Sequence, residues 1–395
     1  MRRKPLPRPE AKTPPFSVKS CHIVPSIEAR YGGPSKSVLG LARGLARGGN
    51  QVELLTTDPA RDWNQSEGSL DIHAFRRNWP GVVCSSRGLR AHLRTVSADV
   101  VHHHSIWLRT LHYAHRAARR LAAPLIVSPR GMMDPWAWRH NSRKKALARF
   151  LIHPGAFEAV DGWHATSSQE AEALRNLGFR QPVCVAPNGV AAPSAEDMSS
   201  ATAYWRGVLR SSESRPVALF YSRFHQKKRL LELIDLWLDM GPKDWLLLVV
   251  GIPEDYTPAS IEDYVLRAGH SGRVRAYDGA GRPPPYSIAS LFLLASHSEN
   301  FGLSIAEALA SGVPALVTDT TPWSLLNRTG SGWCVPWEDF GSALRSATSE
   351  EPDSLRQRGS VGRELILREF SWEKSAQLLS DFYVTLCAGS KARVR

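Results

Sequence analysis

Short apolar segments alternate with segments of helical apolar spacing along most of the chain, and this alternation occurs in two series. In the first series, Val52–Thr56 and Leu125–Ser128 have the length and composition of buried strands, whereas Lys36–Arg47 places apolar residues at helical intervals. A second series begins near Pro216 and includes the very apolar Trp245–Val250. Strands that alternate with helices favour parallel sheets covered by helices on both faces. The sequence therefore predicts an α/β protein.

The length of 395 residues is sufficient for two domains, each with its own core. We expect a basic, disordered tail at residues 1–19 and an N-terminal domain at 20–195. A C-terminal domain is expected at 200–370, and a final helix at 371–390 that packs back on the N-terminal domain. The small, polar segment Ala191–Ser200 is the expected linker.

The cysteines and the hydropathy indicate a cytoplasmic protein. The five cysteines are scattered and odd in number, which is typical of a reducing compartment without a disulfide framework. No apolar run approaches the roughly 20 residues of a membrane span. The basic N-terminus lacks the apolar region of a secretory signal.

The net charge of +13 points to an anionic partner. Aromatic residues do not interleave with the basic ones as a nucleic-acid platform requires, so we expect no nucleic acid. Two interpretations remain for basic segments such as the expected helix Arg139–Leu151. They are solvated helix faces, or they contact anionic lipid headgroups on the inner face of the plasma membrane.

Glu299 and Glu307 flank a turn between a predicted buried strand, Ile288–Ala295, and a predicted helix that begins at Leu303. A loop that leads from a strand into a helix presents backbone N–H groups and the positive end of the helix dipole. Carboxylates there can accept hydrogen bonds from sugar or ribose hydroxyls. Taken alone, the segment is equally compatible with a plain strand–turn–helix unit whose glutamates are solvated.

The run His102-His103-His104 lies in a predicted strand that begins at Asp99. Because neighbouring side chains of a strand point to opposite faces, at most His102 and His104 share one, and no third metal ligand is evident. His104 ends the strand, at the edge where open α/β sheets bind ligands. A hydrogen-bonded core histidine is the alternative for this residue.

Arg223 and Lys228 follow the first strand of the second series and are suited to binding a diphosphate. A solvated basic loop is the alternative. Gly32 and Gly33, after the first strand, let a backbone approach a ligand closely, although a tight turn needs such glycines too. No DxD pair is present. We therefore expect no metal and no other cofactor.

Together these segments resemble the family 4 glycosyltransferases, which are retaining enzymes of the GT-B architecture. The resemblance covers residues 20–390 and implies two facing Rossmann-like domains, an inter-domain cleft and a C-terminal helix that crosses back to the N-terminal domain. Glu299–Glu307 matches the E-x7-E motif of the family, and His104 matches its catalytic histidine. Further similarities are those of Tyr31–Pro34 to the glycine loop, Pro187–Val190 to the "PNGV" segment, Ser222–Lys228 to the phosphate grip, and Phe370–Trp372 to the crossing segment.

The resemblance implies transfer of a sugar from a nucleotide diphosphate sugar to a saccharide or polyprenyl-linked acceptor. Ser128–Met132 and Thr321–Trp323 are similar to bacterial members that act in lipopolysaccharide, O-antigen or exopolysaccharide synthesis. The implied catalytic residues are His104, Glu299, Lys228 and Arg223. The implied donor-binding residues are Gly32, Gly33, Asn300, Phe301, Gly302, Leu303 and Glu307, and the implied acceptor residues are Arg130 and Trp136.

The chain departs from the family pattern at Ser222 and Arg229, where glycines are usual, and at Ala295, where proline is frequent. Two other functions fit part of the sequence. One is a non-catalytic basic protein that binds membrane or nucleic acid, which gives the acidic pair and the glycine loops no purpose. The other is a nucleotide-sugar epimerase of the same fold, which the segments around Glu299 and Trp323 disfavour.

Overall fold

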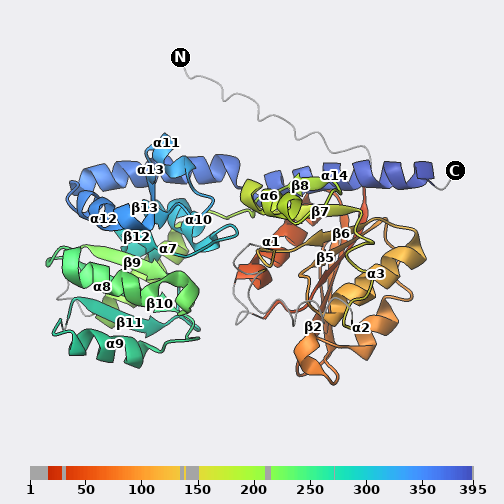
Figure 1. Cartoon of the computed structure of the whole chain (residues 1–395), viewed down its shortest axis with the longest axis horizontal. Coiled ribbons are helices and arrows are strands. Elements are labelled where there is room, and N and C mark those ends of the chain that lie inside the picture. Colours follow the sequence, from red (N-terminus) through yellow and green to blue (C-terminus); the bar gives the residue numbers. More distant parts are fainter. Residues whose placement is uncertain are drawn as a thin grey trace, which may run out of the picture.

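The computed structural model describes residues 17–28, 33–133, 138, 151–209, 215–270 and 272–393. They form two α/β lobes that lie side by side, with long helices running across both (Figure 1). Several expectations fall outside the described residues: nearly all of the tail, Gly32, Trp136 and nearly all of the basic helix at Arg139–Leu151.

The N-terminal lobe is built on a sheet with the strand order β3-β4-β2-β1-β5-β6-β7-β8. Its neighbouring strands pair in parallel, except for the antiparallel β3 and β4 at one edge. The strands are β1 (Lys19–Val24), β2 (Gln51–Asp58), β3 (Trp63–Glu67), β4 (Leu70–Arg76), β5 (Val100–His104), β6 (Leu125–Ser128), β7 (Gly162–Ala165) and β8 (Val183–Val185).

Two cores cover the two faces of this sheet. Because successive strand residues point to opposite faces, β1 places Ile23 in one core and Val24 in the other. Helices α2 and α3 supply the core that holds Ile23, and α1 and α14 supply the core that holds Val24. The helices of this lobe are α1 (Gly33–Arg47), α2 (Arg87–His92), α3 (Arg109–Leu121) and α6 (Ser168–Asn176), with a 3-10 turn η2 (Gly81–Val83).

The C-terminal lobe contains a fully parallel sheet with the strand order β11-β10-β9-β12-β13-β14. One large core, which includes Trp205 and Trp237, surrounds it. The strands are β9 (Val217–Tyr221), β10 (Leu246–Gly251), β11 (Val274–Asp278), β12 (Leu291–Leu294), β13 (Ala315–Thr318) and β14 (Gly332–Val335). The helices are α7 (Ala195–Leu209), α8 (Leu230–Met240), α9 (Pro258–Arg267), α10 (Leu303–Ala310), α11 (Leu325–Thr329), α12 (Phe340–Thr348) and α13 (Pro352–Glu369), with 3-10 turns η3 (Gln226–Lys228), η4 (Pro285–Ile288) and η5 (Trp337–Asp339).

The expected linker at Ala191–Ser200 is wrong over its second half, because α7 begins at Ala195. Trp205 explains why this polar segment is helical. Its side chain is fully buried in the core of the C-terminal lobe, and its indole N–H donates to the Pro283 carbonyl at 2.8 Å. One buried tryptophan thus holds the helix against the lobe although most of its other residues are small or polar.

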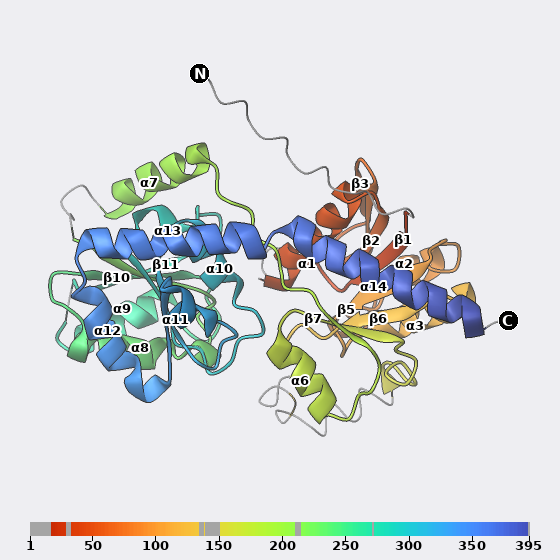
Figure 2. The ribbon, with the colours of Figure 1, turned by 90° about the horizontal axis from the view of Figure 1, so that it is seen from above.

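The C-terminal helix α14 (Trp372–Arg393) returns to the N-terminal lobe after α13 has crossed the C-terminal one (Figure 2). At the crossing, the Val190 N–H donates to the Phe370 carbonyl at 2.7 Å. Trp372 lies so close to α1 that a Cβ on Gly40 would approach its ring to 2.4 Å. The predicted fold class, two Rossmann-like lobes with a returning C-terminal helix, is confirmed.

Candidate active site

The carboxyl ends of the strands in the two sheets meet at the junction between the lobes. Asn300, which follows β12, donates from its side-chain amide to Oγ1 of Thr166, which follows β7, at 2.6 Å. Gly131 lies so close that a Cβ there would be 2.9 Å from the Cβ of Asn300. Lys36 of α1 forms an ion pair with Glu307 of α10. Since parallel α/β sheets bind ligands at these ends, the junction is the candidate site.

Glu299 and Lys228 form a buried ion pair in the C-terminal lobe. Each side chain is 11% exposed, and the Ser296 hydroxyl also donates to Glu299 Oε1, at 2.6 Å. Burial alone raises the pKa of Glu299, but the charge and hydrogen bond of Lys228 outweigh burial, so the pKa is lowered. The structure thus brings together two of the four predicted catalytic residues, with Glu299 ionised at neutral pH.

The loop between Glu299 and α10 is held by aromatic packing. Phe301 is buried, with its ring 5.4 Å from that of Trp323 and 5.9 Å from that of Phe370. Gly302 has φ +76°, and a Cβ there would lie 2.7 Å from Ile305. This glycine therefore sets the start of α10 at Leu303. The Ile305 N–H donates to the Gly302 carbonyl at 2.9 Å, whereas no acceptor is recorded for the amides of Leu303 and Ser304 among the described residues, which suits an anion or a sugar hydroxyl.

Arg223 lies apart from this pair. Its guanidinium bonds Glu254 at 2.9 Å and is 45% exposed, and the described structure records no contact of it with Glu299 or Lys228. Glu307 is also engaged, because it accepts from Lys36 and from the Tyr286 hydroxyl, the latter at 3.0 Å. Both groups are therefore engaged with protein partners in this structure.

The departure from glycine at Arg229 has a local explanation. Arg229 has φ +49°, in the region that favours glycine. Its Nε donates to His297 at 3.0 Å, and its guanidinium lies 4.9 Å from the centre of the Trp337 ring, so two contacts offset the strain of this conformation. Gly33 begins α1, and a Cβ there would meet no atom of the described residues within 4 Å.

His104 ends β5 as predicted, but it does not project into solvent, since it is 1% exposed. Its Nε2 lies 3.0 Å from Nδ1 of His22, and its Nδ1 accepts from Arg130, whose Nη2 lies 3.2 Å away. The expectation that no third histidine accompanies His102 and His104 is wrong, because β1 pairs with β5 and places His22 beside them.

Three residues that sequence reasoning missed complete this region. Asn188 accepts from Nη1 of Arg130 at 3.1 Å, and Ser37 accepts from the same nitrogen at 3.0 Å. Glu170 is buried and accepts from the Gly131 amide at 2.7 Å, so it fixes the loop that follows Arg130. Arg130, predicted to contact the acceptor, directs its guanidinium toward His104. The capping position of Ser167 was the available signal for Glu170, three residues later.

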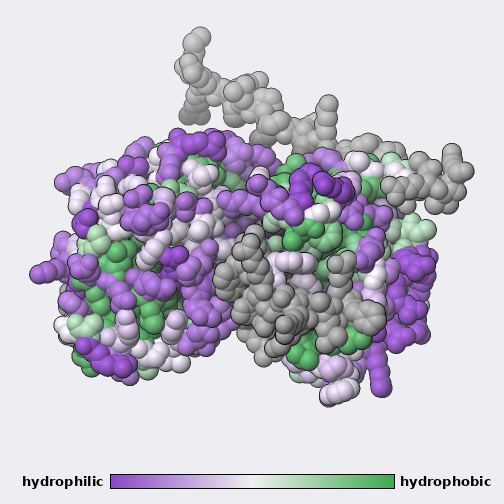
Figure 3. Space-filling model, in the orientation of Figure 1, coloured by the Kyte–Doolittle hydropathy of each residue, from purple (hydrophilic) through white to green (hydrophobic). Residues whose placement is uncertain are grey.

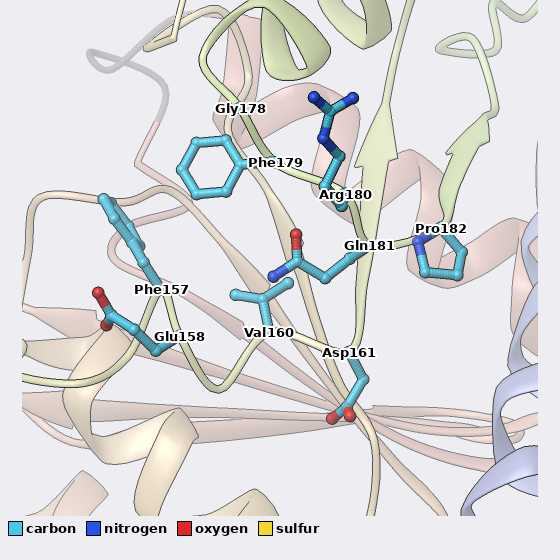
Figure 4. Close-up of a pocket in the computed structure, with 9 residues that line it drawn as sticks. All are labelled: Phe157, Glu158, Val160, Asp161, Gly178, Phe179, Arg180, Gln181 and Pro182. Carbon is cyan, nitrogen blue, oxygen red and sulfur yellow. The ribbon is translucent and has the colours of Figure 1, made fainter.

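A cavity of about 610 Å³ elsewhere in the N-terminal lobe is not this site (Figure 4). Its lining includes Phe157 and Phe179, with Asp161 and Pro182. Asp161 and Pro182 immediately precede β7 and β8, so the cavity lies at the amino ends of these strands. The candidate site lies at the opposite edge of the sheet, beyond their carboxyl ends.

Two family models together match most of the chain. The model described as "Glycosyl transferase 4-like domain" matches residues 32–189, and the one described as "Glycosyl transferases group 1" matches residues 202–360. The chain belongs to the family 4 glycosyltransferases. The enzyme's two matched regions correspond to its two lobes, so the predicted family and the prediction of an enzyme that transfers glycosyl groups are confirmed.

Characterised relatives and solved structures agree with this assignment. The D-inositol 3-phosphate glycosyltransferase of Xylanimonas cellulosilytica is 26% identical, over 98% of this chain and 100% of the relative. The GDP-mannose:cellobiosyl-diphosphopolyprenol alpha-mannosyltransferase of Xanthomonas campestris is 24% identical, over 83% of this chain and 86% of the relative.

Among solved structures, sucrose-phosphate synthase of Thermosynechococcus elongatus superimposes with a TM-score of 0.73 at 19% identity, covering 94% of this chain and 100% of the other. Anabaena HepE, solved in complex with UDP and glucose, gives 0.70 at 17% identity, covering 92% and 99%. At these identities the likeness shows the GT-B fold.

Proposed function

We propose that the enzyme transfers a sugar from a nucleotide diphosphate sugar to a saccharide or polyprenyl-linked acceptor, with retention at the anomeric carbon. The observation that carries the proposal is the buried Lys228–Glu299 pair next to the first turn of α10. Two comparisons support it. HepE was solved with UDP and glucose, and the Xanthomonas relative is named for a GDP-mannose donor and a polyprenol-linked acceptor.

Cleavage of the donor leaves positive charge on the sugar ring and additional negative charge on the diphosphate. Lys228 and the amides around Leu303 supply preorganised positive charge for the leaving group, and each such donor is worth about 3 kcal/mol of barrier. Arg223 joins them once it leaves Glu254. Because these residues do the work of a cation, we propose that no metal takes part, and that EDTA leaves activity unchanged.

The other predicted residues surround the sugar and the nucleoside. In the proposal, Glu299 holds the sugar ring and Glu307 the ribose, while His104 donates to a sugar hydroxyl from the opposite lobe. Gly33 leaves room for the diphosphate beside α1, and Asn300, Phe301 and Gly302 shape the loop next to it. Contact between the lobes through Asn300 excludes water, which favours transfer over hydrolysis.

Substitution of the buried pair tests the assignment. Glu299→Ala and Lys228→Ala are each expected to abolish transfer while the circular dichroism of the fold is retained. Arg356→Ala is the matched control, because it removes an exposed ion pair with Asp353. The assay measures nucleoside diphosphate release with UDP-, GDP- and dTDP-sugars and a bacterial lipid extract as acceptor. Full activity in either site variant contradicts the site.

We further propose that the acceptor belongs to lipopolysaccharide, O-antigen or exopolysaccharide synthesis and that the enzyme works at an anionic membrane surface. No described helix is long and apolar enough to span a bilayer. Arginines from α2, from the segment just after it and from α3 instead line a hollow of about 280 Å³, which we call the arginine groove: Arg90, Arg94, Arg109, Arg116 and Arg120. Figure 3 shows hydrophilic residues along the edge over α3.

An exposed apolar loop adjoins the arginine groove. Trp79 is 92% exposed and Val82 is 85% exposed, and the loop is closed by a 2.7 Å hydrogen bond from the Asn78 amide to the Ser85 carbonyl. Ser85 in turn contacts the hydroxyl of Tyr113, which lines the groove. Aspartate and glutamate are absent from residues 76–98 and 100–133. An indole beside clustered arginines suits an anionic lipid interface.

Vesicle binding tests this proposal. The wild type is expected to bind anionic vesicles and to lose binding as salt rises. A Trp79→Ser/Val82→Ser variant should bind more weakly, whereas Leu266→Ser, which removes a 63% exposed leucine from the other lobe, should not. Equal binding to zwitterionic vesicles, or no binding at all, contradicts the proposal.

A further inference from the structure

We propose that Arg130 is a positioning residue that holds His104 as a neutral imidazole with its proton on Nε2. The inference rests on the proposed function, in which His104 faces the donor sugar, and it adds a residue whose role is to fix the state of that histidine. Its basis is the direction in which each hydrogen bond around His104 must run.

The proton positions follow from Arg130, because a guanidinium can only donate. Its Nε and Nη2 both face Nδ1 of His104, at 3.4 and 3.2 Å. Nδ1 must therefore carry the lone pair, and Nε2 of His104 must carry the proton. That N–H donates to Nδ1 of His22 at 3.0 Å, which places the proton of His22 on its own Nε2.

The Nε2–H of His22, at the end of this series of hydrogen bonds, indicates that Arg130 determines where the protons lie. Nε2 of His22 is buried and has no hydrogen-bond partner among the described residues. The two histidines could reverse their bond, but then Nδ1 of His104 would point an N–H at the guanidinium. In the inferred arrangement one N–H of His22 has no partner among the described residues, but Nδ1 of His104 presents a lone pair to Arg130.

A second series of hydrogen bonds keeps the neighbouring ring of His102 neutral as well. Nε2–H of His164 donates to the Ala186 carbonyl at 2.9 Å, so its Nδ1 accepts from the Ser128 hydroxyl at 2.7 Å. Ser128 then accepts from Nε2–H of His102, at 2.7 Å. Nδ1 of His102 is left to accept from the Tyr383 hydroxyl of α14, at 2.6 Å.

These groups surround His104 from every element packed on it. His22 lies on β1, His102 on β5, His164 on β7 and Tyr383 on α14, and the one carboxylate recorded among the groups that act on Arg130 is that of Glu170 on α6. Burial is the largest cause that lowers the pKa of His104, and the neighbouring His102 ring and the Arg130 guanidinium act in the same direction. Protonation of the ring at neutral pH is thus opposed by burial and by the guanidinium.

Arg130 is itself held in place for this task. Its backbone has φ +52°, which directs the side chain back over the strand ends. Nη1 is shared by Ser37 of α1 and Asn188, which follows β8. A guanidinium fixed from both sides holds the imidazole against rotation. The Nε2–H then remains the ring's one hydrogen-bond donor.

The test compares wild type with Arg130→Met, Arg130→Lys and Arg175→Met, the last removing an exposed arginine of α6. Histidine side chains are labelled with 15N, and His104→Asn identifies the His104 signals. In substrate-free wild type, His104 should show a protonated Nε2 and an accepting Nδ1 from about pH 5.5 to pH 8. Arg130→Met should show mixed tautomers or a titration in that range.

Activity provides the second readout. Arg130→Met should lower kcat roughly 10- to 100-fold, while the donor KM changes by less than about threefold, because a misplaced group weakens the transition state more than binding. Arg130→Lys keeps a charged donor and should restore the tautomer and much of kcat. Arg175→Met should match wild type.

A cationic His104 at neutral pH, a proton on Nδ1, or unchanged spectra and kcat in Arg130→Met would each overturn the inference. The spectra are recorded without substrate, so they remain informative if wild type transfers no sugar. In that case the proposed function fails and the role of Arg130 is judged by the tautomer alone. If Arg130→Met does not fold, the Arg130→Lys spectra and kcat decide.

Discussion

At the scale of single residues, the charge of Glu299 depends on Lys228. Lys228→Met removes the cation, and burial then raises the pKa of Glu299 above its ordinary 4.5. Removal of one partner from a buried pair costs about 3–5 kcal/mol. We expect that loss in the free energy of unfolding near pH 7, measured by urea denaturation.

The difference in the free energy of unfolding between wild type and Lys228→Met should depend on pH. In wild type the lowered pKa stabilises the fold above about pH 4.5, and this contribution is lost as pH falls through the folded-state pKa. In Lys228→Met the raised pKa makes acid favourable, so the gap to wild type should narrow toward pH 4. Arg356→Met, at an exposed pair, should show no such change. A gap that is constant with pH counts against a buried, charge-dependent site.

Tyr383 connects a single hydroxyl to the histidines at the floor of the site. Tyr383→Phe removes the donor to Nδ1 of His102 and leaves a buried acceptor unpaired. We expect a loss of about 1–3 kcal/mol in the free energy of unfolding. Tyr204→Phe, whose hydroxyl accepts from Arg282 at the surface, should lose less than about 0.5 kcal/mol. Equal losses in chemical denaturation would show that the hydrogen bond to His102 contributes nothing specific.

At the scale of elements, the packing of the start of α14 against the N-terminal lobe requires a glycine at position 189. A Cβ on Gly189 would lie 2.4 Å from the backbone nitrogen of Trp372 and 2.5 Å from its Cα. Because the backbone has to shift, Gly189→Ala should destabilise the protein by about 1–3 kcal/mol and expose residues 370–372 to protease. Gly207→Ala on α7 meets no atom within 4 Å and should be neutral or stabilising by up to about 1 kcal/mol. Similar effects of the two variants would contradict this account of the crossing.

Most strands and helices could be predicted because their burial follows the apolar pattern. Trp245–Val250 and Val217–Tyr221, for example, correspond to β10 and β9 almost residue for residue. The edge hairpin β3–β4 and the short α2 were not among the predicted segments. β3 has a polar, half-exposed sequence, and α2 spans only six residues with Leu89 as its buried one. β3 and α2 carry too few apolar residues for periodicity to reveal them, whereas the alternation of Leu70, Ile72 and Ala74 in β4 was an available signal.

The candidate site was predictable where its residues are close in sequence. Glu299, Gly302 and Glu307 lie within one strand–turn–helix unit, so spacing alone placed them together. His22 could not be assigned, because sequence does not state that β1 lies beside β5. The orientation of the Arg130 side chain could not be predicted either, because it depends on a positive φ and on contacts with Ser37 and Asn188.

At the scale of the whole molecule, the two lobes contact each other through groups that we propose bind the donor. Glu307, proposed to hold the ribose, is paired with Lys36 of the opposite lobe, and Asn300 is bonded to Thr166. If the donor binds Glu307 as proposed, Lys36 either shares the carboxylate with it or is displaced. We expect displacement, so that the junction between the lobes competes with the nucleotide for Glu307.

Lys36→Ala tests this competition. Lys36 is 63% exposed, so solvent screens the pair and its loss should be small for stability. Removal of a competing partner raises the fraction of Glu307 that is free, so we expect the donor Kd to fall by about two- to fivefold, as measured by calorimetry. If Lys36 instead binds the diphosphate, the same substitution raises Kd. Lys36→Ala with Glu307→Gln separates the two cases, because competition predicts that Lys36→Ala has no further effect once Glu307 is neutral, whereas a phosphate contact predicts the same loss in both backgrounds.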